Sequence, residues 1–244
     1  MKQTKIREEQ WSPEQVSRRF ARDGTGTVSH ETLYTHVYKD MRAGGDLHKH
    51  LRHCCKSCRK RGCGRERRGG LRNQVMIDER PSVVEERSRI GDWEMDTVIG
   101  KPGGPVLVTM VERVSRDTLI ALATSREALG VGAAILAAMK GSKEKFMTMT
   151  YDNGKEFAHH ELLADLLGAS AYFAHPYHSW ERGLNENTNG LIRQYPPKGT
   201  DFRSLTGEEV AGIQNKLNSR PRKCLDYPTP DDIFHAPPPI ALAA

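Results

Sequence analysis

From Gly91 onward the sequence alternates short apolar runs with helical patterns, and this alternation restricts the possible folds most strongly. Runs of apolar and β-branched residues predict strands, and the Ala/Leu-rich or amphipathic stretches between them predict helices. The expected strands are 93–99, 106–114, 118–123, 146–151 and 169–174, and the expected helices are 126–140, 161–167, 182–194 and 208–218. A three-strand meander followed by helix, strand, helix and strand predicts an α/β domain with a mixed five-stranded sheet flanked by helices.

Two short helices are predicted over residues 11–40. Ser12 and Gln15 have the spacing of a capping box, and Ser29 caps the second helix after a glycine-rich break. Helix, turn and helix form the skeleton of a DNA-binding helix-turn-helix, although an ordinary helical hairpin is the alternative. The candidate DNA contacts on the second helix are His30, Tyr34 and Thr35.

The positive charge of the chain is concentrated in one segment. The whole chain carries 37 Lys and Arg against 31 Asp and Glu, a formal net charge of +6. Residues 49–72 hold ten of these basic residues and one glutamate, a net charge of +9, so the remainder is at −3. Such a run predicts binding to a polyanion through counterion release, and a merely solvated basic linker is the alternative. The candidate DNA contacts in it are Arg59, Lys60, Arg61, Arg65, Arg67 and Arg68.

Composition excludes several other classes of protein. The longest uncharged helical run, 128–139, has 12 residues, whereas a membrane span needs roughly 20. The polar N-terminus has no apolar signal-peptide centre, so we expect a soluble intracellular protein without a membrane partner.

The sequence does not indicate a chemical role for four clustered cysteines or for the histidines at 175 and 178. Cys55 and Cys58 have zinc-ligand spacing, but no second properly spaced pair accompanies them, so we do not expect zinc there. The roles of Cys54, Cys55, Cys58 and Cys63 stay open. His175 and His178 are interpreted as packing residues or DNA-groove contacts.

Three carboxylates carry the strongest chemical signal. Asp96 lies inside an apolar strand, Asp152 follows a strand just before Asn-Gly, and Glu186 lies near the start of a helix. Carboxylates that converge on one point can bind Mg²⁺. Two such ions can stabilise the attacking and the leaving oxygen of an in-line phosphoryl transfer. Each acid also has an alternative role. Asp96 would be a polar residue of an edge strand, Asp152 a turn former and Glu186 a partner of the helix dipole. Glu94 shares the strand face of Asp96, so spacing alone does not choose between them.

Three stretches resemble the acidic motifs of the DDE transposases of the insertion sequence 30 family. They are residues 90–100, 151–157 and 175–202, and the 33 residues between Asp152 and Glu186 are the spacing of that family. Residues 11–15 and 28–32 are similar to its helix-turn-helix, and 217–223 to its C-terminal end.

This resemblance implies a fold, a reaction and a set of site residues. It implies a helix-turn-helix unit over 1–45, a basic linker over 46–84 and an RNase H-like catalytic core over 85–244. Asp96, Asp152 and Glu186 would be the catalytic residues and ligands of two Mg²⁺ ions, with Mn²⁺ as a substitute. The expected reaction is DNA strand cleavage at the element's ends and transfer to target DNA, without a covalent protein–DNA intermediate. Candidates for orienting DNA or supporting Glu186 are Asn185, Asn189, Arg193 and Lys198, with helix-face packing as the alternative.

The expected partners are the element ends and a target duplex, bound by a homodimer or higher oligomer in the bacterial cytoplasm at the nucleoid. Family members usually carry a further N-terminal helix-turn-helix, which suggests a truncated copy. The competing hypothesis is therefore a catalytically silent DNA-binding fragment that competes with a full-length transposase. A two-metal nuclease for RNA–DNA hybrids is a weaker hypothesis, because a helix-turn-helix suits the major groove of B-form DNA.

Overall fold

The computed structural model describes residues 2–52, 71–141, 145–176 and 178–236. Its contacts divide the chain into two compact units. One consists of Met1–Ser57 together with Asn218–Ala244, and the other of Cys58–Leu217. The expected boundaries at residues 45 and 84 remain predictions.

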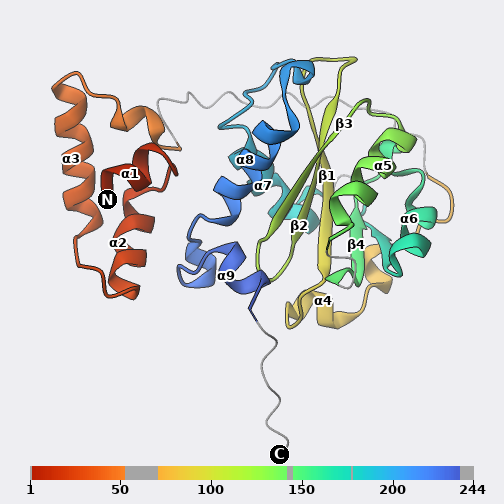
Figure 1. Ribbon diagram of the computed structural model, residues 1–244. Helices are drawn as coiled ribbons and strands as arrows, with labels where there is room; N and C mark the ends of the chain where they lie inside the picture. The colour runs from red at the N-terminus through yellow and green to blue at the C-terminus, as the bar shows by residue number, and fades with distance from the viewer. Residues whose placement is uncertain (1, 53–70, 142–144, 177, 237–244) are drawn as a thin grey trace, which may run out of the picture. The chain divides into compact units, whose positions relative to one another are not determined.

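A mixed five-stranded sheet forms the centre of the second unit, as the alternation predicted (Figure 1). The strand order is β3-β2-β1-β4-β5; β1 and β3 pair antiparallel to β2, and β4 pairs parallel to both β1 and β5. The strands are β1 (Asp92–Ile99), β2 (Val106–Glu112), β3 (Thr118–Ala123), β4 (Thr148–Tyr151) and β5 (Ser170–Phe173). Each of them overlaps a strand expected from the sequence.

The helices that follow the strands also match the expected ones, and they cover both faces of the sheet (Figure 1). They are α5 (Ala128–Met139), α6 (His160–Leu167), α7 (Gly183–Ile192) and α8 (Gly207–Asn218). Val98 of β1 and Leu107 of β2 pack with Ile192 of α7 and Leu217 of α8 in one apolar cluster. Because side chains alternate along a strand, Asp96 points to the same face as Val98, toward α7.

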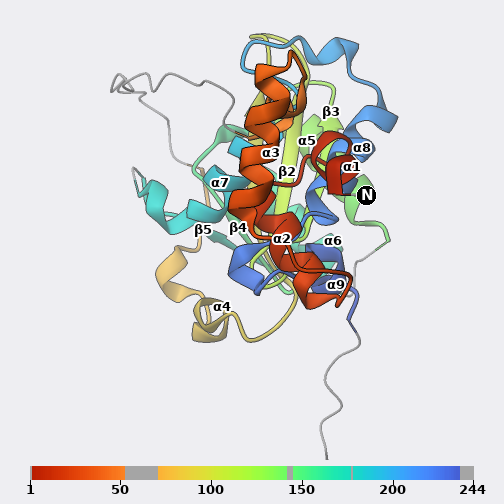
Figure 2. The same cartoon turned by 90° about the vertical axis from the view of Figure 1, so that its left-hand side faces the viewer.

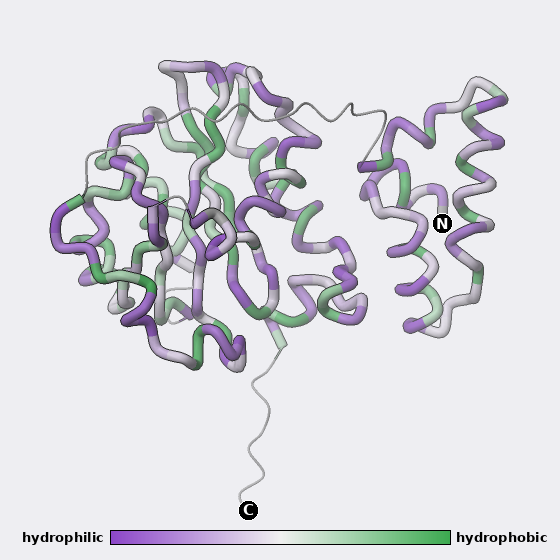
Figure 3. Tube along the Cα trace, turned by 180° about the vertical axis from the view of Figure 1, so that it is seen from behind, coloured by the Kyte–Doolittle hydropathy of each residue, from purple (hydrophilic) through white to green (hydrophobic). Residues whose placement is uncertain are grey.

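The opposite face of β1 is mainly apolar. Trp93 and Met95 are buried there, and the Trp93 ring stacks on Phe146 with centroids 4.5 Å apart. Figure 3 shows hydrophobic residues concentrated along the strands and hydrophilic ones in the connecting loops. The acids of β1 therefore lie on a strand that packing on both faces holds in one position.

The first unit begins with α1 (Lys2–Arg7), α2 (Pro13–Arg22) and α3 (His30–Arg42), which Figure 2 shows from a second side. The capping box of Ser12 and Gln15 and the Ser29 cap are confirmed. The helices share an apolar core, formed by Ile6, Trp11, Val16, Phe20, Leu33, Val37 and Leu47. The two predicted helices, α2 and α3, are thus held by a core that includes α1, a helix not predicted from the sequence.

The C-terminal stretch belongs to the same unit and contacts α2. Glu14 accepts hydrogen bonds from Lys223 at 2.8 Å and from the Tyr227 hydroxyl at 2.9 Å. Arg19 pairs with Asp232 at 2.5 Å. This stretch, predicted to be extended, contains the short helix α9 (Pro230–Phe234), which begins with its own capping box at Thr229.

The remaining elements are short. They are α4 (Ser82–Glu86) and the 3₁₀ turns η1 (Leu47–His50), η2 (Ile77–Glu79), η4 (Lys155–Phe157), η5 (Ser179–Arg182), η6 (Phe202–Ser204) and η7 (Lys223–Leu225). Two of these, η1 and η2, lie in the segment expected as a linker, and α4 begins in it, so parts of that segment are regular. Along the described stretches of the chain, no helix is both long and apolar enough to cross a membrane.

Candidate active site

The register of two parallel strands brings Asp96 and Asp152 together. Glu94 of β1 lies opposite Thr150 of β4. Two residues further along each strand stand Asp96 and Asp152, at the point where the two strands stop pairing. Neighbouring strands lie about 4.8 Å apart, so the backbone alone makes these two acids neighbours at the carboxyl end of β4.

A tight turn after β4 fixes the Asp152 carboxylate. Its Oδ1 accepts a hydrogen bond from the Gly154 N–H at 2.9 Å. A Cβ atom at Gly154 would stand 2.7 Å from that same Oδ1 and 2.6 Å from Cδ of Glu156. The close approach of two carboxylates therefore favours glycine at this position. The Asp-Asn-Gly sequence predicted a turn here but not this steric constraint.

Arg182 lies between the two aspartates. Its Nη1 is 3.8 Å from Oδ2 of Asp96, and its Nη2 is 3.5 Å from Oδ2 of Asp152. Nη1 also donates to the Met95 carbonyl at 3.3 Å. One guanidinium thus faces both carboxylates. The two negative charges together stabilise a positive charge at this point. Arg182 was not among the site residues predicted from the sequence, although it precedes Glu186 by only four residues.

Burial gives the Asp96 carboxyl an unusual proton affinity. Desolvation raises its pKa to about 6, and the neighbouring Asp152 charge adds to the rise, whereas Arg182 opposes it. The carboxylate keeps two hydrogen bonds, from the Thr97 N–H at 2.8 Å and from Asn189 Nδ2 at 2.9 Å. A bound cation would oppose this rise in pKa by stabilising the ionised carboxylate.

Helix α7 contributes the third predicted acid. Asn189 donates to Asp96 and accepts from the Thr109 hydroxyl at 3.1 Å, which joins α7 to β1 and β2. Glu186 stands one turn earlier on this helix and is exposed. Residues three apart share a helix face, so Glu186 lies on the side of α7 that approaches Asp96. Asn185 is buried and 1% exposed, which removes its side chain from direct contact with DNA.

Glu94, which spacing could not separate from Asp96, has a different environment. It is 2% exposed and its Oε1 pairs with Arg113 at 2.7 Å. Arg113 in turn pairs with Glu85 of α4 at 3.0 Å. Glu94 is therefore engaged in a buried ion pair, whereas Asp96 borders the Arg182 position.

The other candidate DNA contacts are spread over both units. Arg193 donates to the Ile99 carbonyl at 2.5 Å and lies over the Phe202 ring, so it packs against the end of β1. Lys198 is exposed in the loop after α7. On α3, His30 and Thr35 are exposed and Tyr34 is half-buried beside Tyr38.

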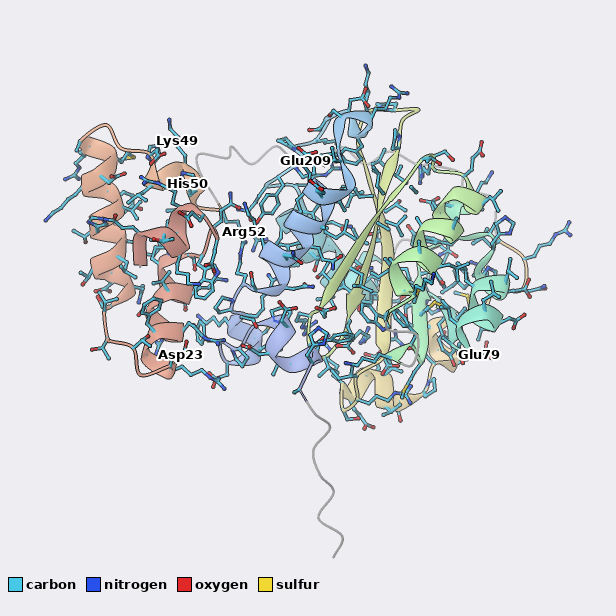
Figure 4. All side chains as sticks on the ribbon, in the orientation of Figure 1. Asp23, Lys49, His50, Arg52, Glu79 and Glu209 are labelled. Atoms are coloured by element: carbon cyan, nitrogen blue, oxygen red, sulfur yellow. The ribbon has the colours of Figure 1, made fainter. Side chains whose placement is uncertain are left out.

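The structure describes only the two ends of the basic segment. The candidates Arg59, Lys60, Arg61, Arg65, Arg67 and Arg68 lie outside the described residues. Its first members, Lys49 and Arg52, lie on and just after η1 of the first unit, where Figure 4 labels them.

A groove of about 900 Å³ adjoins the acidic turn. Its walls include the end of β1 at Ile99, the Gly154–Glu156 turn and Arg126. Glu156 is buried in its wall, where it pairs with Arg126 at 2.8 Å and accepts from the Thr97 hydroxyl at 3.1 Å. This fourth acid, which was not predicted as a site residue from the sequence, neutralises Arg126 in the wall of the groove.

The donor set suits a hard divalent cation. Asp96 and Asp152 are both about four-fifths buried and face a single positive group. Carboxylate oxygens are the ligands that Mg²⁺ prefers, and the Arg182 guanidinium beside both acids shows that positive charge is stabilised there. The residues present therefore fit the expected ion.

The chain is similar to several curated transposases. It is 46% identical over 230 residues to the transposase for insertion sequence element IS4351 of Bacteroides fragilis, covering 94% of this chain and 71% of the relative. It is 37% identical to the transposase for IS1086 of Cupriavidus metallidurans, covering 91% and 68%. It is 36% identical to transposase InsI for IS30A of Escherichia coli, covering 93% and 62%. No protein-family model matches the chain.

A solved structure supports the same placement at the level of the fold. A chain of the simian T-cell lymphotropic virus intasome, solved with a PP2A regulatory subunit, superposes with a TM-score of 0.51 at 18% identity. The superposition covers 87% of this chain and 77% of that one. The predicted RNase H-like sheet is thus confirmed, and with 46% identity to a curated relative over 94% of its residues the chain belongs to the insertion sequence 30 family of transposases.

Proposed function

We propose that this transposase cleaves DNA strands at the ends of an insertion sequence and joins them to target DNA, using Asp96, Asp152 and Glu186. The observation that carries the proposal is the convergence of Asp96 and Asp152 on one positive group at the carboxyl end of β4. The contact of Asn189 with Asp96, which brings the helix of Glu186 to the same place, supports it.

Each residue has a defined task in this proposal. Asp96, Asp152 and Glu186 hold two Mg²⁺ ions, for which Mn²⁺ can substitute. Asn189 fixes the orientation of the Asp96 carboxylate while Thr109 fixes Asn189. The chemistry supplied by the bound ions is activation of a water or a DNA 3′-hydroxyl and stabilisation of the leaving 3′-oxygen, so no protein side chain needs to bond covalently to DNA. Arg182 already lies beside both acids and is suited to contact the phosphate brought there.

DNA binding is assigned to three surfaces. The N-terminal part of α3, with His30, Tyr34 and Thr35, would enter the major groove. The basic segment would neutralise phosphates, and the exposed Lys198 in the loop after α7 would add a further phosphate contact. Because two element ends must be joined, we propose a homodimer or higher assembly on DNA, acting at the nucleoid. Light scattering of the complex with end-containing duplex tests the assembly.

A nicking assay tests the catalytic assignment. Glu186→Gln should leave the affinity for duplex DNA within about twofold, because a single exposed charge changes little. It should reduce Mg²⁺-dependent nicking of a labelled duplex carrying the element ends by at least 100-fold. Removing one of three carboxylates deprives the ions of charge that an amide cannot replace.

Glu208→Gln on the exposed first turn of α8 is the matched control and should nick at the wild-type rate. EDTA should abolish nicking by the wild-type chain. Nicking by Glu186→Gln at the wild-type rate would refute the assignment. Tight DNA binding without nicking by the wild-type chain in Mg²⁺ or Mn²⁺ would instead favour the silent competitor.

A further inference from the structure

A second group of potential metal ligands stands beside the acidic site. His175 follows β5, His178 lies three residues later, and Glu181 lies in η5. Oε1 of Glu181 accepts a hydrogen bond from Nδ1 of each histidine, both at 3.0 Å. Along the described stretches, these three residues form the only group of His, Cys, Asp and Glu in which at least three ligand atoms lie within 4.8 Å of one another.

The spacing of these atoms is close to that of a zinc site. Tetrahedral ligands at about 2.0–2.1 Å from zinc lie about 3.3–3.4 Å from each other. The two nitrogen–oxygen distances of 3.0 Å therefore need to open by only a few tenths of an ångström. The ion would replace the two protons that the histidines now share with Glu181, and it would leave one position for solvent.

The groups around this cluster hold the ligands in place. Nε2 of His175 is 3.0 Å from Oδ2 of Asp78, so this ring has its other nitrogen directed at a carboxylate, as metal-binding histidines usually do. Oε2 of Glu181 accepts the His175 backbone N–H at 2.8 Å. The His178 ring stacks on Trp180 with centroids 4.4 Å apart. These three contacts restrict the orientation of both imidazole rings and of the Glu181 carboxylate, as a metal site requires.

We propose that His175, His178 and Glu181 bind one divalent transition metal, with zinc the best fit, and that this ion is distinct from those of the acidic triad. Two imidazole nitrogens and one carboxylate oxygen favour zinc over Mg²⁺, which prefers oxygen ligands only. The partly open positions of His175, His178 and Glu181, at 29%, 42% and 18% exposure, give the ion access.

The position of this site gives it a structural task. Arg182 directly follows Glu181 in the chain and faces both aspartates, and α7 begins at the next residue. A metal at the cluster would tie the end of β5 to the start of α7. The site therefore deepens the proposed function by fixing the backbone of Arg182, but metal binding itself does not depend on cleavage.

Cobalt absorption tests the site directly. The probe is Co²⁺ titrated into the tag-free full chain in which all five cysteines are replaced by serine, so that thiolates do not contribute. We expect the visible bands of tetrahedral Co²⁺ at one equivalent, displaced by one equivalent of Zn²⁺. Glu186→Gln should keep these bands, which separates this site from the acidic triad and from the fate of the proposed cleavage.

Three variants sharpen the result. His178→Ala should remove the bands, while His159→Ala, at an exposed histidine outside the cluster, should keep them. Asp78→Asn should keep the bands but weaken binding roughly 10–100-fold through the His175 ring. Circular dichroism checks that each variant is folded. Absence of tetrahedral bands in the starting chain, or bands that survive in folded His178→Ala, would overturn the proposal.

Discussion

Asp96 is a carboxylate whose charge destabilises the folded chain in the absence of a bound cation. Its pKa is about 6 in the folded state against an ordinary value of 3.8, mainly because of desolvation. Proton uptake therefore favours folding. The penalty is fully present above pH 6 and disappears as the pH falls toward 4. Two pKa units correspond to about 3 kcal/mol at most.

Replacing this charge should stabilise the protein. In EDTA at pH 7.5, Asp96→Asn should raise the free energy of unfolding by about 1–2 kcal/mol, because about 1 kcal/mol is lost with one hydrogen bond. Urea denaturation at pH 7.5 and pH 4 measures the effect, which should be absent at the lower pH. Asp201→Asn is the control without a gain, since hydrogen bonds from Arg203 lower the pKa of that exposed carboxyl. An Asp96→Asn variant no more stable than wild type at pH 7.5 would contradict the assigned burial penalty.

Single residues also show where sequence reasoning stops. The choice of Asp96 over Glu94 rested on the family resemblance alone, because both acids point to the same face of β1. What distinguishes them physically is Arg113, nineteen residues from Glu94, which neutralises Glu94 in the interior. Arg182 was missed for a similar reason: its partners lie on β1 and after β4, and only the register of the parallel pair brings them together.

At the scale of elements, the turn after β4 is sensitive to substitution at Gly154. Gly154 has a φ of −71°, which any residue tolerates, so the constraint is purely steric. In Gly154→Ala the new methyl would meet the carboxylates of Asp152 and Glu156 at 2.6–2.7 Å and displace them. We expect Mg²⁺-dependent nicking to fall at least tenfold, with a loss of about 1–3 kcal/mol of stability from the crowding.

Gly212→Ala in α8 is the matched substitution, because nothing lies within 4 Å of its new Cβ. It should keep nicking unchanged and slightly stabilise the helix, since alanine is the better helix former. Nicking rates and urea midpoints of the two variants measure the contrast. Wild-type nicking by Gly154→Ala would show that Asp152 does not depend on this turn.

The larger elements were predictable because their signals are local. The five strands and α5 to α8 each carry an apolar periodicity that one face of the sheet or helix must bury. The short helices α1 and α9 lack a long periodic pattern, and they exist because Ile6 and Phe234 are buried by the packing of their unit. The His175–His178–Glu181 cluster depends on the bend between β5 and α7, which spacing alone does not specify.

At the scale of the whole molecule, charge separates the two proposed tasks. The segment 49–72 carries a net charge of +9, while the rest of the chain is at −3. In the second unit, three of the arginines, Arg113, Arg126 and Arg182, already face carboxylates. Affinity for DNA phosphates should therefore come mainly from the basic segment.

The salt dependence of DNA binding tests this division of charge. Each neutralised phosphate adds about 0.9 to the slope of log affinity against log salt. Replacing Arg59, Lys60, Arg61, Arg65, Arg67 and Arg68 by glutamine should therefore flatten the slope by up to about 5. Replacing the five arginines among them by lysine keeps the charge and should keep the slope, because counterion release depends on charge rather than on hydrogen-bond geometry. Fluorescence anisotropy of a labelled duplex between 50 and 200 mM salt measures both. If the glutamine variant keeps the wild-type slope, the segment is only a tether and the phosphate contacts must come from α3 and the second unit.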